Sequence, residues 1–136
     1  MVTMTAKSLS NLTCESAHTP SGTFLKTDAP VDVGGAASSF SPTDLVSVGL
    51  LTCILTTMGL VANKIGVDLT GATGSVEKIM TESKPRRIAK LVTELNLPVA
   101  VTDEQREKLE HAAHHCPVHQ SLHPDIEADI VFSWQA

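Results

Sequence analysis

The chain contains one long uncharged segment, which lies between Asp44 and Lys64. Drawn as a helix, this segment has no polar face, so it must be covered on every side by protein or by lipid. It is just long enough to cross a bilayer. Its scattered Ser, Thr and Gly residues and the strand-like sequence around it favour a buried central helix, and we expect no membrane span.

The start of this helix is marked by local signals. Ser41 is a good N-cap, Pro42 suits the first turn, and Asp44 stands where an acidic form of the capping box would place its carboxylate. We therefore expect a helix over residues 42–64 that stops near Gly66.

The rest of the chain is typical of short strands and two surface helices. Strands are expected within 2–14, 23–27, 67–80 and 126–134, with a turn at 18–22, a loop at 32–39 and an ambiguous helix or strand at 86–97. Thr102 caps an amphipathic helix that ends at Cys116, and a short helix follows from Pro117 to Leu122. The pattern predicts a single α+β domain over 1–136. One small sheet cannot cover the central helix, so a second subunit is expected.

Composition excludes several classes of partner. Aromatic residues make up only 3% of the chain, so the core must be aliphatic and platforms for stacking bases are not expected. The net charge of -5, with no basic run longer than the pair Arg86 and Arg87, argues against nucleic-acid binding. The N-terminus lacks the features of a secretory signal, and three cysteines do not make a disulfide scaffold. We expect a cytoplasmic protein.

Two cysteines offer reactive chemistry. Cys53, in the uncharged helix, is either a small buried hydrophobe or a reactive thiol that needs a donor from the tertiary structure. Cys116 precedes Pro117 and would cap the short helix, whose N–H groups and dipole favour a negative sulfur; a cysteine that merely caps a turn is the other interpretation. The two thiols could close a reversible disulfide if the fold brings them together. Cys14 is most simply a core residue. Asp44 lies about 13 Å from Cys53 along a helix and could only orient an intermediate cation.

Histidines crowd the sequence around Cys116, at His111, His114, His115, His119 and His123. His111 and His115 are four residues apart and share a helix face, and Cys116 and His119 have the spacing of metal ligands. A zinc or copper site is therefore one interpretation. The other is a solvated helix end, where cations suit the dipole. Only Cys14 and His18 could supply a second ligand pair, and we expect no metal.

Two motifs together resemble a known family. SPTDLVSVGLLTC (41–53) and HHCPVHQSL (114–122) are similar to the OsmC/Ohr family, the osmotically inducible and organic hydroperoxide resistance proteins. FLKTDAPVDVGGAASSF (24–40) and the closing strand also look like this family, so the likeness spans nearly the whole chain. It implies an OsmC-like α+β fold, with antiparallel sheets wrapped around long central helices in an intertwined homodimer.

The resemblance also implies thiol-dependent peroxidase chemistry on hydroperoxides, and the apolar surroundings of Cys53 favour organic ones. Cys53 matches the peroxidatic cysteine and Cys116 the resolving one, so a Cys53 sulfenic acid would condense to a disulfide that an external dithiol reduces. No cofactor is needed. Asp44 matches the acid of the looser OsmC-like branch. The rival interpretation is a non-catalytic small-ligand or metal-binding dimer of the same fold.

The chain departs from the family's best characterised peroxidases in two respects. They place a Glu ten residues before the peroxidatic cysteine, where this chain has Thr43. They also hold the thiolate with an N-terminal Arg, whereas no Arg precedes Arg86 here. His18, Lys26 or a residue of the partner chain are the candidates for the missing activating group.

Overall fold

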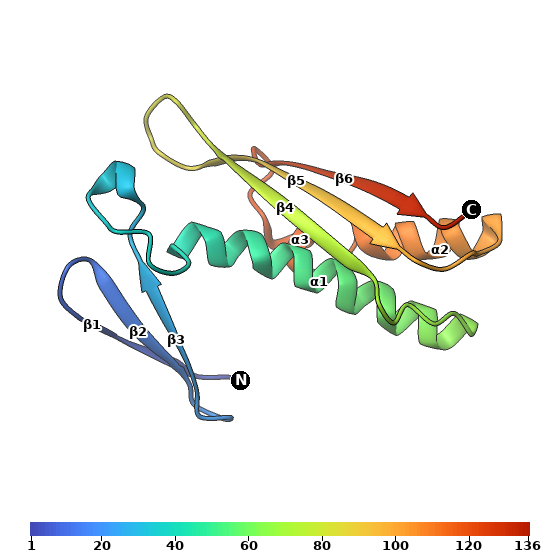
Figure 1. Cartoon of the computed structure of the whole chain (residues 1–136), viewed down its shortest axis with the longest axis horizontal. Helices are drawn as coiled ribbons and strands as arrows, with labels where there is room; N and C mark the ends of the chain where they lie inside the picture. The colour runs from blue at the N-terminus through green and yellow to red at the C-terminus, as the bar shows by residue number, and fades with distance from the viewer. The chain divides into compact units, whose positions relative to one another are not determined.

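The computed structural model describes residues 1–136 and has an α+β architecture, which confirms the expected fold class (Figure 1). The elements in chain order are β1 (Met4–Ser8), β2 (Thr13–His18), β3 (Thr23–Asp28), a short 3-10 helix η1 (Val31–Val33), α1 (Pro42–Ile65), β4 (Thr73–Met80), β5 (Ile88–Leu97), α2 (Asp103–His114), α3 (Pro117–Ser121) and β6 (Glu127–Trp134). The chain divides into two compact units, Met1–Val46 and Ser47–Ala136. Organisation as one domain stays a prediction.

The first unit contains an antiparallel sheet in the order β1-β2-β3. Its register pairs Met4 with His18 and Thr13 with Asp28. Large apolar side chains such as Met4 and Phe24 are exposed on it. Because three short strands bury little apolar surface by themselves, this sheet needs cover from outside the unit.

The loop after β3 is organised by Asp28 and Gly35. The Asp28 carboxylate accepts hydrogen bonds from the Ser38 hydroxyl at 2.6 Å and from the Ser38 N–H at 3.0 Å. The hydroxyl bond is the main cause that lowers the pKa of the Asp28 carboxyl, and the backbone bond adds to it. Gly35 lies so close to the Ala29 carbonyl that an added Cβ would overlap it. This loop leads the chain into α1.

α1 begins and ends close to where its sequence predicts. The Ser41 N–H donates to Asp44 Oδ2 at 2.8 Å, and the Asp44 N–H donates to Ser41 Oγ at 3.1 Å, which completes the reciprocal capping box. Gly66 follows the last helical residue with φ +74°, the left-handed conformation that commonly ends a helix.

The second unit contains a mixed sheet in the order β4-β5-β6. β4 and β5 pair antiparallel, as expected, but β5 and β6 pair parallel, so the expectation of antiparallel sheets is corrected for this one pair of strands. The reason is the connection: α2 and α3 carry the chain back to the end of the sheet where β5 began, so the next strand must run the same way. The ambiguous segment is strand β5, with Leu91, Thr93 and Leu95 buried in alternation.

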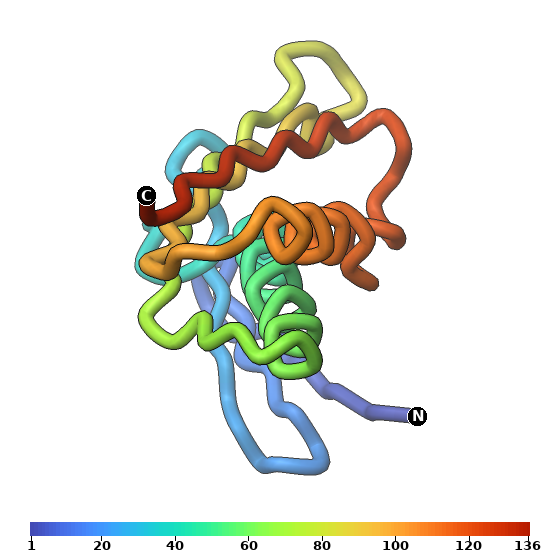
Figure 2. Tube along the Cα trace, turned by 90° about the vertical axis from the view of Figure 1, so that its right-hand side faces the viewer, coloured from blue at the N-terminus to red at the C-terminus, as the bar shows by residue number.

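α1 and α2 lie on the same face of this sheet, as the views in Figures 1 and 2 agree. The α1 residues that are buried follow a spacing of three to four, as expected for one face of a helix: Ser47, Leu50, Ile54, Met58 and Ala62. They pack with residues of β5 and α2 in one aliphatic core. By length and composition alone α1 could cross a membrane, a test that core helices also pass. In this fold a third of its most apolar stretch is buried, on the face that packs into the core.

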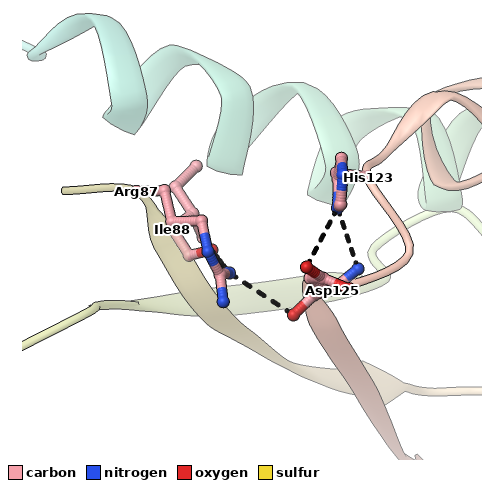
Figure 3. Close-up of polar contacts among 4 residues, drawn as sticks. All are labelled: Arg87, Ile88, His123 and Asp125. Atoms are coloured by element: carbon pink, nitrogen blue, oxygen red, sulfur yellow. Dashed lines mark hydrogen bonds and ion pairs between the residues drawn. The ribbon is translucent and has the colours of Figure 1, made fainter. Parts of the chain in front are cut away.

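The connection between α3 and β6 is tied to the β4–β5 hairpin (Figure 3). Arg87 Nη1 donates to the carbonyl of Ile88 at 2.9 Å and to the carbonyl of Asp125 at 3.4 Å. The Asp125 N–H donates to His123 Nδ1 at 3.0 Å. These bonds fix the chain that follows α3 against the sheet, and so help to hold α3 in place.

Replacing Gly35 with Ala should lower the free energy of unfolding by about 1–3 kcal/mol, because the new methyl group would force the loop away from the Ala29 carbonyl. Chemical denaturation monitored by circular dichroism measures this. The control is Ala36→Ser, an exposed neighbour in the same loop, which should change stability by less than about 0.5 kcal/mol. Equal stability of the two variants would contradict the close packing at Gly35.

Candidate active site

The fold brings the thiols of Cys53 and Cys116 together within the second unit. Cys53 lies in the middle of α1 and is half-buried, while Cys116 lies between α2 and α3 and is fully buried. Both pack into the same aliphatic core, and Cys53 is one of the neighbours that raise the pKa of the Cys116 thiol. Both are free cysteines. Two sulfurs that are far apart in sequence are thus neighbours in space.

Cys116 is the N-cap of α3, as its position before Pro117 predicts. Its Sγ accepts a hydrogen bond from the His119 N–H at 3.4 Å. The helix N-terminus was expected to favour a negative Cys116 sulfur, but burial of the sulfur outweighs this effect. Burial is the largest influence and raises the pKa of the Cys116 thiol, the His119 N–H lowers it, and the interaction with Cys53 raises it again, so the pKa is raised overall. The Cys116 sulfur therefore holds its proton more firmly than an ordinary thiol does.

Thr57 is a neighbour of Cys53 that sequence analysis missed. Its Oγ1 lies 3.9 Å from Cys53 Sγ, one helical turn further along α1. Residues four apart share a helix face, so this spacing was the available signal. Thr57 also lines a groove of about 640 Å³ between α1 and α2. The other residues along the groove are Val61, Glu104, Glu107, Lys108, His111, Ala112 and His115.

The histidines around Cys116 do not converge on one point. His111 and His115 stack with ring centroids 4.0 Å apart, and His115 Nδ1 bonds the His111 carbonyl at 2.8 Å. His114 instead contacts the rings of His119 and Phe132. Burial, followed by the neighbouring His114 and His115, lowers the pKa of the His119 imidazole. No three His, Cys, Asp or Glu side chains are arranged to hold a metal ion, so the geometry gives no support to the metal-binding interpretation.

The remaining candidates lie in the first unit. Asp44 supplies its carboxylate to the cap of α1, and its part in the chemistry of Cys53 stays a prediction. Cys14 is half-buried in β2 rather than fully in a core. His18 Nδ1 is hydrogen-bonded to Ser21 Oγ at 2.6 Å, and Lys26 is exposed. These positions do not identify His18 or Lys26 as the group that activates a thiol.

Comparison with known proteins places this arrangement in a family. The family model described as OsmC-like protein matches residues 35–131, which include α1 with Cys53 and α3 with Cys116. The chain belongs to the OsmC-like family. No functionally curated protein matches the sequence.

Solved structures show the same OsmC-like fold over nearly the full length. A protein of Psychrobacter arcticus, described in terms of osmotic stress induction and a detoxification response, is 32% identical with a TM-score of 0.92, over 98% of this chain and 96% of that one. An organic hydroperoxide resistance protein of Legionella pneumophila is 19% identical with a TM-score of 0.74, over 98% and 96%. Another, from Elizabethkingia anophelis, is 19% identical with a TM-score of 0.78, over 99% and 96%. The latter two are similar in fold alone.

The raised pKa of Cys116 predicts a loss of stability in alkali. The buried thiol favours folding below the unfolded-state pKa of about 8.5, and this contribution is lost as the pH rises through the higher folded-state pKa. Between about pH 7.5 and pH 10.5, reduced wild-type protein should therefore lose more free energy of unfolding than Cys116→Ala, measured by urea denaturation. Cys14→Ser, the control, should keep the wild-type slope. If the free energy of unfolding fell equally with pH in wild type and Cys116→Ala, the raised pKa of Cys116 would be contradicted.

Proposed function

We propose that the protein is a cytoplasmic thiol-dependent peroxidase that reduces hydroperoxides, preferably organic ones, through Cys53 and Cys116. The observation that carries this proposal is that a half-buried thiol and a fully buried one pack in the same core of an OsmC-like fold. The difference in burial supports a division of roles. An oxidant can approach Cys53, whereas Cys116 is sealed from solvent and keeps its proton.

The reaction follows from these two sulfurs in three steps. The Cys53 thiolate attacks the O–O bond of the hydroperoxide, which breaks; with one proton taken up, the products are an alcohol and a Cys53 sulfenic acid. Cys116 then gives up its proton and attacks the sulfenic sulfur as the thiolate, which forms a Cys53–Cys116 disulfide and expels the hydroxyl group; this hydroxyl and the Cys116 proton leave as water. An external dithiol reduces this disulfide by exchange and is itself oxidised. No metal or organic cofactor enters any step.

The family and the surroundings of Cys53 support this substrate class. Solved structures that share the fold are named organic hydroperoxide resistance proteins. Cys53 packs against an aliphatic core, and the groove beside its neighbour Thr57 includes apolar side chains such as Val61. An alkyl group of a hydroperoxide would be stabilised in such surroundings more than hydrogen peroxide would be. We include Asp44 in the site as the acid of the OsmC-like branch, acting through its control of the start of α1.

Replacement of Cys53 with Ser should abolish turnover of cumene hydroperoxide, since a hydroxyl cannot form the sulfenic acid. Cys116→Ser should instead leave Cys53 trapped as a sulfenic or over-oxidised species, which mass spectrometry detects after dimedone labelling. Cys14→Ser is the matched control and should retain both turnover and formation of one disulfide. Normal turnover by Cys53→Ser would remove the catalytic assignment, and thiols that resist peroxide in wild-type protein would favour the non-catalytic alternative.

We also propose that the protein is a homodimer in which a second copy covers the outer face of α1. Gly49, Thr52, Thr56 and Gly59 follow one another at helical spacing along this face, beside the 59% exposed Leu60. A Cβ added at Gly49 or Gly59 would meet no atom within 4 Å, so the face is open to close approach by another helix. The exposed sheet of the first unit needs cover for the same reason, since its Phe24 is 68% exposed.

Leu60→Glu should therefore weaken self-association by at least about a hundredfold, because a carboxylate would be buried without a partner. Light scattering after size exclusion, over a range of protein concentrations, measures the molecular mass. The matched control is Val131→Glu, on an exposed position of β6, which should leave the mass unchanged. A monomeric wild-type protein, or a Leu60→Glu variant that associates as wild type does, would contradict the proposed interface.

A further inference from the structure

The Cys53 sulfur has polar neighbours in the second unit, and they are uncharged. The Thr57 hydroxyl is its hydrogen-bonding neighbour, and Cys116, which packs in the same core, lies close enough for Cys53 to raise its pKa. A thiolate in apolar surroundings is unfavourable unless donors or positive charge stabilise it. The chain has no Arg before Arg86, so other groups must stabilise the Cys53 thiolate.

The Thr57 hydroxyl is positioned toward the sulfur. In a helix, a Thr hydroxyl commonly bonds the carbonyl four residues earlier, and Thr52 does so with Val48 at 2.9 Å. For Thr57 the hydrogen-bonding neighbour of Oγ1 is Cys53 Sγ, at 3.9 Å. Thr57 is half-buried and also borders the groove between α1 and α2.

Ionisation of Cys53 fixes the direction of both interactions. A thiolate has no proton to give, so it can only accept, and the hydroxyl and the Cys116 thiol must then donate. A hydrogen bond to an ionised acceptor is shorter and roughly twice as strong as one between neutral groups. The buried Cys116 keeps its proton and is therefore available as a donor. Both contacts are thus weak for the neutral thiol and strengthen when the thiolate forms.

We propose that Thr57 is a positioning residue that donates a hydrogen bond to the Cys53 thiolate and, together with the Cys116 thiol, stabilises it without a guanidinium group. This inference rests on the proposed role of Cys53 as the nucleophile. The turn of α1 that follows Cys53 thereby takes part in activating the Cys53 thiol. We also predict that activation needs the hydroxyl group of Thr57 and not its methyl group.

The test measures the rate at which iodoacetamide alkylates Cys53 across about pH 5 to 10, in protein that carries Cys14→Ser. Peptide mass spectrometry assigns the label to Cys53. Thr57→Val keeps the shape and branching of the side chain but removes the hydroxyl, so the pH midpoint should rise and the rate at pH 7 should fall by about threefold to tenfold. Thr57→Ser keeps the hydroxyl and should stay within about twofold of wild type.

The matched control is Thr56→Val, the same substitution one residue earlier at an exposed position, and it should leave the profile unchanged. A Thr57→Val profile that superimposes on wild type would overturn the proposal. So would a Thr57→Ser profile shifted as far as that of Thr57→Val, because the packing of the methyl group would then be the cause. Far-ultraviolet circular dichroism checks that each variant is folded, and Thr57→Ser keeps the test decisive if Thr57→Val does not fold.

Alkylation requires no peroxide, so the outcome is independent of the peroxidase assignment. If wild-type protein turned over no hydroperoxide but Thr57→Val still shifted the profile, the hydrogen bond would stand and the proposed function would fall. If wild-type protein turned over hydroperoxide normally but the Thr57→Val profile did not shift, the proposed function would stand and the role of Thr57 would fall.

Discussion

The packing of α1 against β5 and α2 is the interaction on which the site depends. Ile54 is fully buried in this core, and Cys53 is the residue before it. Because successive helical residues are about 100° apart around the axis, Cys53 lies at the border of the buried face. It can therefore contact the core on one side and remain half-exposed on the other. Cys116 follows α2, which packs into the same core, so one set of apolar contacts positions both sulfurs.

The two thiols differ because desolvation outweighs local hydrogen bonding. Cys116 has the favourable position of a helix N-cap and receives the His119 N–H, yet its burial raises its pKa. α3 spans only Pro117–Ser121, so its dipole is small, while the cost of an ion in the aliphatic core is large. The protein thus contains one protected thiol that keeps its proton and one that an oxidant can approach.

The same helix also explains why a single copy leaves apolar surface exposed. α1 buries a face that includes Leu50 and Met58 in its own core, while Leu60 on the other side remains exposed. The small residues of that side allow a close approach by another helix. Exposed apolar side chains such as Phe24 also occur on the first unit. This exposed apolar surface is the basis of the proposed assembly of two copies.

The sequence by itself determined the elements whose signals are local. The capping box of Ser41 and Asp44 and the left-handed Gly66 set the ends of α1, and Thr102 with Gln105 forms a second capping box at α2. These features depend on residues three or four positions apart, so they can be recognised without tertiary contacts. The α+β class and the family motifs were recognisable for a similar reason, since the residues that carry them are contiguous.

Only the tertiary structure decided the remaining features. Residues 86–97 had no distinct period, and pairing with strands on both sides made them β5. β6 runs parallel to β5 because of the crossover through α2 and α3. The contact of Cys53 with Cys116, and the raised pKa of the latter, require the folded core, because desolvation depends on every atom that surrounds the sulfur and not on its neighbours in sequence.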